Sequence, residues 1–188
     1  ISRLLAVLSV VALVLYPVLI FFGLKFFNIK IVGFGASVLL ALRLGLFKGR
    51  SILGFYVLIA LGLSLSFNLI GIFFHSDTFY KFYPVIINFC FMAAFIHSLS
   101  GSQSIIEQFA RLKNAVLSEQ AIAYTRNLTK VWILFFAING SVAAYTAFFR
   151  PIEEWTFYNG FLSYVLCGLL FAGEKIFRIY FLKKNPAA

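Results

Sequence analysis

The chain has 188 residues, of which 62% are hydrophobic, 19% aromatic and 12% charged. A soluble domain carries about twice this share of charge, so the composition excludes a soluble enzyme, a disordered chain and a disulfide-rich secreted scaffold. It indicates an integral membrane protein whose length allows at most about six spans of roughly 20 residues each. The formal net charge of +10 would suit nucleic-acid binding unless the basic residues follow a membrane topology.

Six apolar segments are predicted to cross the membrane as helices. In chain order they are residues 4–24, 31–47, 52–74, 84–99, 131–149 and 155–173. Pro84 suits the first turn of the fourth span, and a polar stretch, residues 100–130, separates the fourth span from the fifth. The sequence therefore predicts one all-α transmembrane domain, residues 1–188, built as a six-helix bundle.

The distribution of Lys and Arg predicts the orientation of this bundle. With both termini in the cytoplasm, twelve of the sixteen basic residues fall on the inner side and four on the outer side. Three acidic residues share the inner side, which leaves it nine units positive. We expect this rim to contact anionic lipid headgroups. Topology accounts for the charge, and no nucleic-acid partner is predicted.

The cytoplasmic segment 100–130 contains a helical stripe. Ile105, Phe109, Leu112 and Val116 follow one another at spacings of four, three and four residues, which predicts an amphipathic helix on the inner leaflet or under the bundle. Such a helix could anchor the loop, or it could dock a cytosolic or membrane protein partner.

Polar side chains inside the predicted spans are the strongest pointers to function, because polarity inside a membrane is costly. The fourth span contains Asn88, the fifth contains Asn139, and the sixth contains Asn159 and Tyr164. Together with Trp132 in the fifth span, these residues are our candidates for a ligand or lipid path. Alternatively, the asparagines form interhelical hydrogen bonds of roughly 0.6–2 kcal/mol each.

Charged residues near the inner ends of the spans suggest a polar cytoplasmic mouth. Glu174 and Arg178 stand four residues apart, as an ion pair on one helix would require. Alternatively, Glu174 pairs across the bundle with Arg43 or Arg126. Because no second carboxylate lies in any predicted span, a proton relay between carboxylates is not expected.

The outer loop after the third span contains His75 and Asp77. These two residues could form part of an acid–base pair or a weak metal site, but we favour a polar turn at the membrane interface. The two cysteines, Cys90 and Cys167, fall inside predicted spans and are expected to be free thiols. The sequence contains no clustered metal-ligand motif and no phosphate loop, so we predict neither a metal nor a cofactor.

Two stretches resemble the bacterial intracellular septation protein A family, a group of small inner-membrane proteins. Residues 73–84 are similar to the outer loop of that family. The second match, over the last two spans, consists of Leu128, Trp132, Phe135, Phe136, Gly140, Tyr145, Ala147, Pro151 and Trp155. Two positions depart from the family pattern, because Asn159 replaces a usual Lys and Ala143 replaces a usual Asn.

The chain is more closely similar to an uncharacterised family of bacterial inner-membrane proteins. The shared motifs are Tyr-x-Arg-x-Leu-Thr-x-x-Trp, here Tyr124 to Trp132, and Tyr-Asn-Gly, here Tyr158 to Gly160. Members of that family tend to be encoded beside genes for aryl-polyene or xanthomonadin-type pigment lipids. The resemblance implies a role near pigment-lipid assembly and supplies no catalytic residue.

These observations favour an inner-membrane accessory protein for envelope or pigment-lipid assembly. It would bind or translocate a lipid-linked amphiphile, or hold soluble synthases at the membrane. One alternative is a small solute transporter or channel subunit, acting alone or as a homo-oligomer. Others are a purely structural scaffold and an intramembrane transferase that uses His75 and Asp77.

Overall fold

The computed structural model describes residues 7, 11–12, 14–46, 51–112 and 115–184. Within these ranges the regular secondary structure is entirely helical. Most of the N-terminal half of the predicted first span falls outside the described residues, as do Lys48 and Arg50 of the predicted inner rim.

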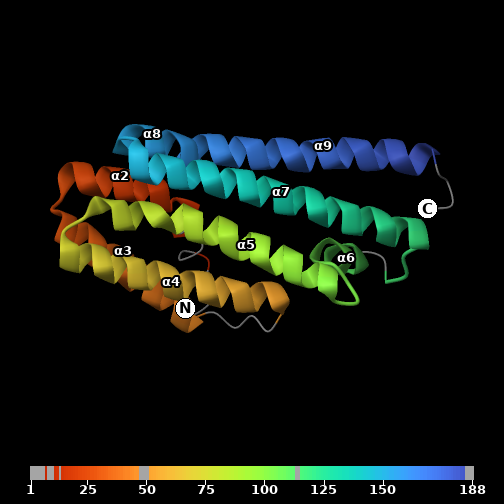
Figure 1. Cartoon of the computed structure of the whole chain (residues 1–188), viewed down its shortest axis with the longest axis horizontal. Coiled ribbons are helices and arrows are strands. Elements are labelled where there is room, and N and C mark those ends of the chain that lie inside the picture. Colours follow the sequence, from red (N-terminus) through yellow and green to blue (C-terminus); the bar gives the residue numbers. More distant parts are fainter. Residues whose placement is uncertain (1–6, 8–10, 13, 47–50, 113–114, 185–188) are drawn as a thin grey trace.

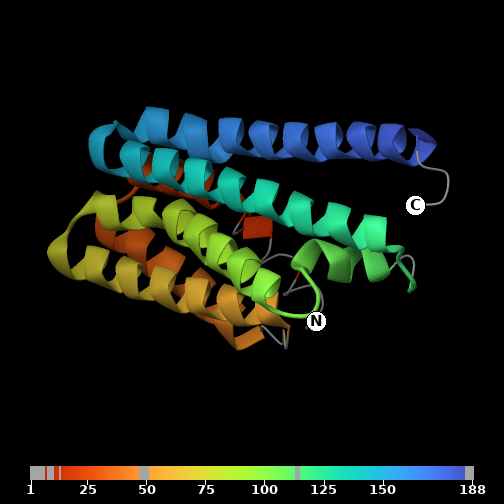
Figure 2. The same ribbon diagram turned by 45° about the vertical axis from the view of Figure 1, so that its right-hand side comes forward.

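The described helices run roughly side by side along the long axis of the molecule (Figures 1 and 2). In chain order they are α2 (Tyr16–Phe26), α3 (Ile29–Leu46), α4 (Ile52–Phe74), α5 (Tyr83–Ser100), α6 (Ile105–Arg111), α7 (Glu119–Phe149), α8 (Ile152–Phe157) and α9 (Ser163–Lys184). A 3-10 turn, η1 (Asp77–Phe82), precedes α5, and a π-helical turn, η2 (Tyr158–Leu162), joins α8 to α9. The first turns of α7 and the last turns of α9 lie on the same side of the molecule as the C-terminus and extend beyond the α3–α4 pair (Figure 1).

In the described part of the chain, four helical segments are long and apolar enough to cross a membrane. They are Ile52–Phe74, Asp77–Ser100, Glu119–Phe149 and Ile152–Ile179. The apolar helices Tyr16–Phe26 and Ile31–Leu44 are shorter. The chain is thus an all-α protein with several membrane-spanning helices, and the six-span topology remains a prediction.

Serine caps mark where α4, α6 and α7 begin, at Ser51, Ser104 and Ser118. Ser51 accepts a hydrogen bond from the Gly54 amide, and α4 accordingly has the bounds of the predicted third span. Ser118 accepts a hydrogen bond from the Ala121 amide, so that α7 begins twelve residues before the apolar run from Val131. The stretch 119–130, expected to be loop, is therefore the first part of a 31-residue helix.

The predicted amphipathic helix is shorter than its stripe. α6 ends at Arg111, whereas the stripe continues to Val116. Ile105 is buried, but the exposed fractions of Leu112 and Val116 are 84% and 89%. Only the first turns of this segment pack under the bundle, because the later apolar side chains follow the end of the helix.

Helix ends near η1 and α8 are joined around Trp155. Its indole is fully buried, and Nε1 donates a hydrogen bond of 3.1 Å to the carbonyl oxygen of Lys81 in η1. Tyr80, also in η1, is buried in the same apolar cluster with Tyr16 of α2 and Ala147 of α7. This cluster holds α8 and η2 against the bundle and thereby places the polar side chains that follow.

Candidate functional site

The π-helical turn η2 orients the Tyr-Asn-Gly motif toward α7. The hydroxyl of Tyr158 donates to Oδ1 of Asn139 at 2.8 Å, and Nδ2 of Asn159 donates to Oγ1 of Thr146 at 3.1 Å. Gly160 lies against α2, where an added Cβ would stand 3.1 Å from Cγ2 of Val18. Single π-helical turns occur often at functional sites, and this one brings two polar side chains to the interior.

Asn88 and Asn139 connect α5 to α7. Nδ2 of Asn139 donates to Oδ1 of Asn88 at 2.9 Å, and Nδ2 of Asn88 donates to the Pro84 carbonyl oxygen at 2.8 Å. The two helices can approach because Gly140 has no side chain: a Cβ there would stand 3.0 Å from Cβ of Asn88. These two amides therefore form an interhelical hydrogen bond, which the sequence analysis gave as the alternative to a ligand path.

Four of the five predicted path residues line one cavity of about 350 Å³ in the middle of the bundle. They are Asn88, Asn139, Asn159 and Tyr164. The hydroxyl of Tyr164 donates to the Val14 carbonyl oxygen at 2.6 Å. Arg43 of α3 also lines this cavity. We call it the central cavity.

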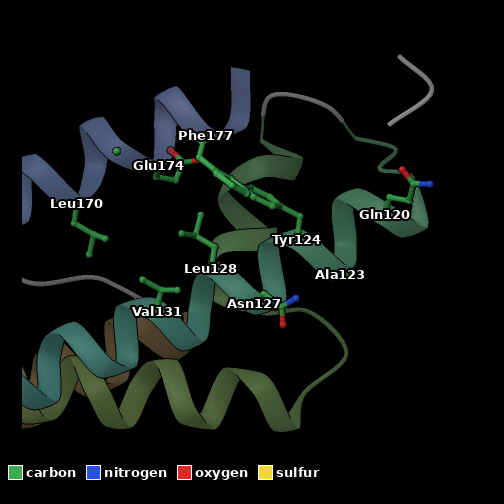
Figure 3. A pocket seen from close by; sticks show the side chains of 10 residues that line it. Gln120, Ala123, Tyr124, Asn127, Leu128, Val131, Leu170, Glu174 and Phe177 are labelled. Atoms are coloured by element: carbon green, nitrogen blue, oxygen red, sulfur yellow. The ribbon is translucent and has the colours of Figure 1, made fainter. Parts of the chain in front are cut away.

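A second hollow, of about 730 Å³, lies between α7 and α9 (Figure 3). Its lining is Gln120, Ala123, Tyr124, Asn127, Leu128, Val131, Leu170, Gly173, Glu174 and Phe177. Apolar side chains dominate one end, while amide, hydroxyl and carboxylate groups gather toward the other. We call it the α7–α9 groove.

Aromatic contacts cross between α7 and α9 at two levels. The rings of Tyr124 and Phe177 stack with centroids 6.1 Å apart, and the Tyr124 hydroxyl donates to Oε1 of Glu174 at 3.3 Å (Figure 3). The ring of Trp132 packs against Phe171 at 4.5 Å. Trp132, the fifth predicted path residue, thus belongs to the helix contact between the two hollows rather than to the cavity lining.

The central cavity and the α7–α9 groove follow one another along the same helix faces. On α7, positions 128, 131, 135 and 139 recur at spacings of three or four residues, as do 163, 167, 170 and 174 on α9. Such spacings place side chains on one side of a helix. The pair Trp132–Phe171 stands between the two hollows of this seam.

Two of the four residues of the predicted cytoplasmic mouth form an ion pair, and the other two lie elsewhere. Glu174 pairs with Arg178 on its own helix, with Oε1 and Nε 3.4 Å apart. Arg126 instead donates from Nη2 to the Leu99 carbonyl oxygen at 2.7 Å, at the end of α5. Arg43 lines the central cavity. Of the two predicted pairings of Glu174, the structure shows the one with Arg178 on the same helix.

The outer loop forms a turn. His75 caps the end of α4 in the left-handed conformation, with φ 53°, and its amide donates to the Gly71 carbonyl oxygen. Oδ2 of Asp77 lies 3.8 Å from Nζ of Lys81. In the turn before α8, Nε of Arg150 donates a hydrogen bond to Oε2 of Glu154, which raises the pKa of the Arg150 guanidinium. Within the described residues, no three His, Cys, Asp or Glu side chains are grouped to hold a metal ion, and Cys90 and Cys167 are free thiols.

Comparison with known proteins gives the family. No family model matches the chain, and no solved structure matches it. The inner membrane-spanning protein YciB of Shewanella sp. strain ANA-3 is 32% identical over 177 residues, which cover 90% of this chain and 91% of that protein. The proteins of the same name from Shewanella oneidensis and from strain W3-18-1 are 32% and 30% identical over the same coverage.

The chain belongs to the YciB family. It is accordingly a multi-pass protein of the bacterial inner membrane. The resemblance to the septation proteins, drawn from the outer loop and the last two spans, is confirmed and extends over 90% of the chain. None of these YciB names refers to pigment lipids.

Some residues of the candidate site were not predicted from the sequence. Tyr158 stands beside Asn159 in the quoted motif, but its bond to Asn139 depends on the π-helical turn. Leu170 and Gly173 line the groove, and the three- and four-residue spacing of apolar positions along α9 was the available signal. Arg43 was assigned to the mouth because its helix ends three residues later, whereas its side chain lines the central cavity.

Proposed function

We propose that this protein binds a lipid-linked amphiphile along the seam between α7 and α9, as an accessory to envelope or pigment-lipid assembly. The observation that carries the proposal is the succession of two hollows on the same faces of two helices, each largely apolar with a few polar side chains. An elongated amphiphile, with a polar group and an apolar chain, suits such a pair of hollows. The groove volume of about 730 Å³ lies within the range typical of small-molecule sites, roughly 300–1,000 Å³.

The position of the groove along α7 favours loading from the cytoplasmic side. A helix of 31 residues is roughly 46 Å long, which exceeds the roughly 30 Å hydrocarbon core of a bilayer. The section 119–130 contains Glu119, Arg126 and Lys130, whereas 131–149 contains no charge. On the predicted orientation, the groove therefore lies at the inner boundary of the membrane, where a chain leaving a soluble synthase would arrive.

The link to pigment lipids rests on the resemblance carried by Tyr124 to Trp132 and Tyr158 to Gly160. Both motifs supply residues of the seam: Tyr124 lines the groove, and Asn159 lines the central cavity. Docking of a soluble synthase is supported by the exposed apolar side chains Leu112 and Val116 at the same inner end. On this basis we propose a pigment lipid as the bound amphiphile and a docked soluble synthase as its source.

A solute pathway has weaker support. Asn88 and Asn139 are bonded to each other, and Asn159 is bonded to Thr146 and to the Trp155 carbonyl oxygen. Amides engaged in this way hold helices together and offer few groups to a moving solute. A purely structural scaffold would use the same hydrogen bonds but would have no use for the groove.

Two glycines of α9 provide a matched test in cells. Both Gly173 and Gly168 are exposed, and a Cβ at either position would meet no atom within 4 Å. Only Gly173 lines the groove. We expect a deletion strain to change the amount or the leaflet distribution of an envelope lipid. Gly168→Trp should restore the wild-type pattern, whereas Gly173→Trp should not.

Two results would contradict the proposed function. One is a deletion strain in which every envelope lipid keeps its amount and leaflet distribution. The other is full restoration by a Gly173→Trp protein that is present at the wild-type level, because its indole would occupy the groove.

A further inference from the structure

The central cavity carries an unusual charge for the interior of a membrane protein. Among the described residues that line it, Arg43 is the one cation and none is acidic. Arg43 is the fifteenth residue of α3 and lies inside the predicted second span. Arg43 is half-buried near the end of this span, and a charged side chain within a span is a candidate functional residue.

The groups around Arg43 suit an anion. The lining includes the hydroxyl-bearing residues Tyr83 and Ser163, whereas the amides of the three asparagines already donate hydrogen bonds within the bundle. The remaining wall is largely apolar, with Phe91, Phe135 and Phe136 among its members. An apolar wall lowers the local dielectric constant and strengthens the attraction between a guanidinium and an anion. Guanidinium groups bind phosphate and carboxylate through paired hydrogen bonds.

The size of the cavity limits the part of the ligand that fits. About 350 Å³ is near the lower end of small-molecule sites, roughly 300–1,000 Å³. This space suits a head group better than a complete two-chain lipid. The apolar chain would continue past Trp132 and Phe171 into the α7–α9 groove.

We propose that the central cavity binds the acidic head group of the amphiphile, a phosphate or a carboxylate, and that Arg43 provides the positive charge. This inference rests on the proposed function and names the chemical class of its ligand. It differs from attraction of anionic lipids by the basic inner rim, because Arg43 acts inside the bundle.

Trp132 is a natural reporter for this binding, because it lies between the cavity and the groove. The chain contains one other tryptophan, Trp155, which is buried at the outer end. The Trp155→Phe protein would therefore report from Trp132 alone. It is placed in phosphatidylcholine vesicles with increasing amounts of a lipid brominated on its chain, since bromine quenches nearby tryptophan. The wild-type protein, with both tryptophans, serves as a second background.

Three brominated probes separate the ligand classes. They are phosphatidylglycerol, stearic acid and phosphatidylcholine. The proposal expects half-maximal quenching at about tenfold lower content of an anionic probe than of the neutral one, the gain typical of a charge-assisted contact. The phosphate and carboxylate probes show which acidic group is preferred.

The variants compare a cavity charge with a rim charge. Arg43→Gln should abolish the preference for the anionic probe, and Arg43→Lys should retain part of it. The matched control is Lys175→Gln, which removes one positive charge from an exposed residue of α9 that lines neither hollow. This control should keep the preference. Circular dichroism of each variant verifies that the helices are intact.

Each outcome decides the inference. Equal quenching by anionic and neutral probes would overturn the role of Arg43 and leave the proposed function standing. A preference that survives in Arg43→Gln but disappears in Lys175→Gln would assign selection to the rim. Absence of quenching by all three probes would overturn both the inference and the proposed function.

Discussion

Trp132 of α7 and Phe171 of α9 pack against each other with ring centroids 4.5 Å apart. Trp132 is 4% exposed, whereas Phe171 is 58% exposed. One side of the contact is therefore fixed in the bundle, and the other side belongs to a helix with no buried residue in its described part. The contact stands between the central cavity and the α7–α9 groove, so movement of α9 would change the separation between them.

The bond between Asn88 and Asn139 should be measurable as a coupling energy. We expect a double-mutant cycle with Asn88→Ala and Asn139→Ala to give about 0.6–2 kcal/mol, the range for polar contacts between membrane helices. The measurement is reversible unfolding in mixed micelles. The control cycle pairs Asn88→Ala with Ser141→Ala, because Ser141 bonds only within its own helix, to the Ala137 carbonyl oxygen. Equal coupling in both cycles would contradict the contact.

Two glycines of α3 should differ sharply in their tolerance of alanine. A Cβ on Gly33 would clash with the Tyr80 hydroxyl and lie 2.6 Å from Cγ1 of Ile72. Gly33→Ala should therefore lower the free energy of unfolding by about 1–3 kcal/mol, the usual cost of overpacking. At Gly35 a Cβ would meet nothing within 4 Å, and Gly35→Ala should cost nothing. Thermal unfolding of the two proteins would refute this packing if their midpoints were equal.

The left-handed conformation of His75 predicts the effect of two substitutions. His75→Gly should keep or raise the free energy of unfolding, by up to about 1 kcal/mol, because glycine adopts positive φ without strain. His75→Val should lower it by about 1–2 kcal/mol. Complementation of the deletion strain should be complete with His75→Gly. Loss of complementation with a stable His75→Gly protein would instead favour the acid–base interpretation.

The predicted orientation can be tested with single cysteines in a Cys90→Ala, Cys167→Ala background. Glu153 of α8 and Gln103, two residues before α6, are both exposed. The helices α8 and α6 lie at opposite ends of the bundle (Figure 1). In spheroplasts, a membrane-impermeant maleimide should label Glu153→Cys directly and Gln103→Cys only after the membrane is permeabilised. Labelling in the reverse order would contradict the positive-inside assignment.

Hydropathy predicted the helices better than their ends. The third span could be given its observed bounds because an uninterrupted apolar run follows Ser51, which caps the helix. The start of α7 could not, since the cap at Ser118 begins a helix in polar sequence, where hydropathy carries no signal. The π-helical turn at Tyr158–Leu162 could not be predicted either, because it occurs together with contacts to α2 and α7 that the local sequence does not show.

The candidate site could be predicted in its residue types but not in its geometry. Polarity within apolar spans identified Asn88, Asn139 and Asn159, which do line one cavity. The facing direction of Arg43 depends on the rotation of α3 about its axis, and a short apolar helix gives little indication of that rotation. The groove could not be predicted because it lies between two helices. The sequence of one helix does not show how it packs against another.

The most direct test of amphiphile binding is native mass spectrometry of the protein released from mild detergent. The account predicts that wild-type and Gly168→Trp proteins retain a bound amphiphile and that Gly173→Trp, whose indole would fill the α7–α9 groove, does not. Equal retention by Gly173→Trp and Gly168→Trp, or no bound amphiphile on the wild-type protein, would contradict it.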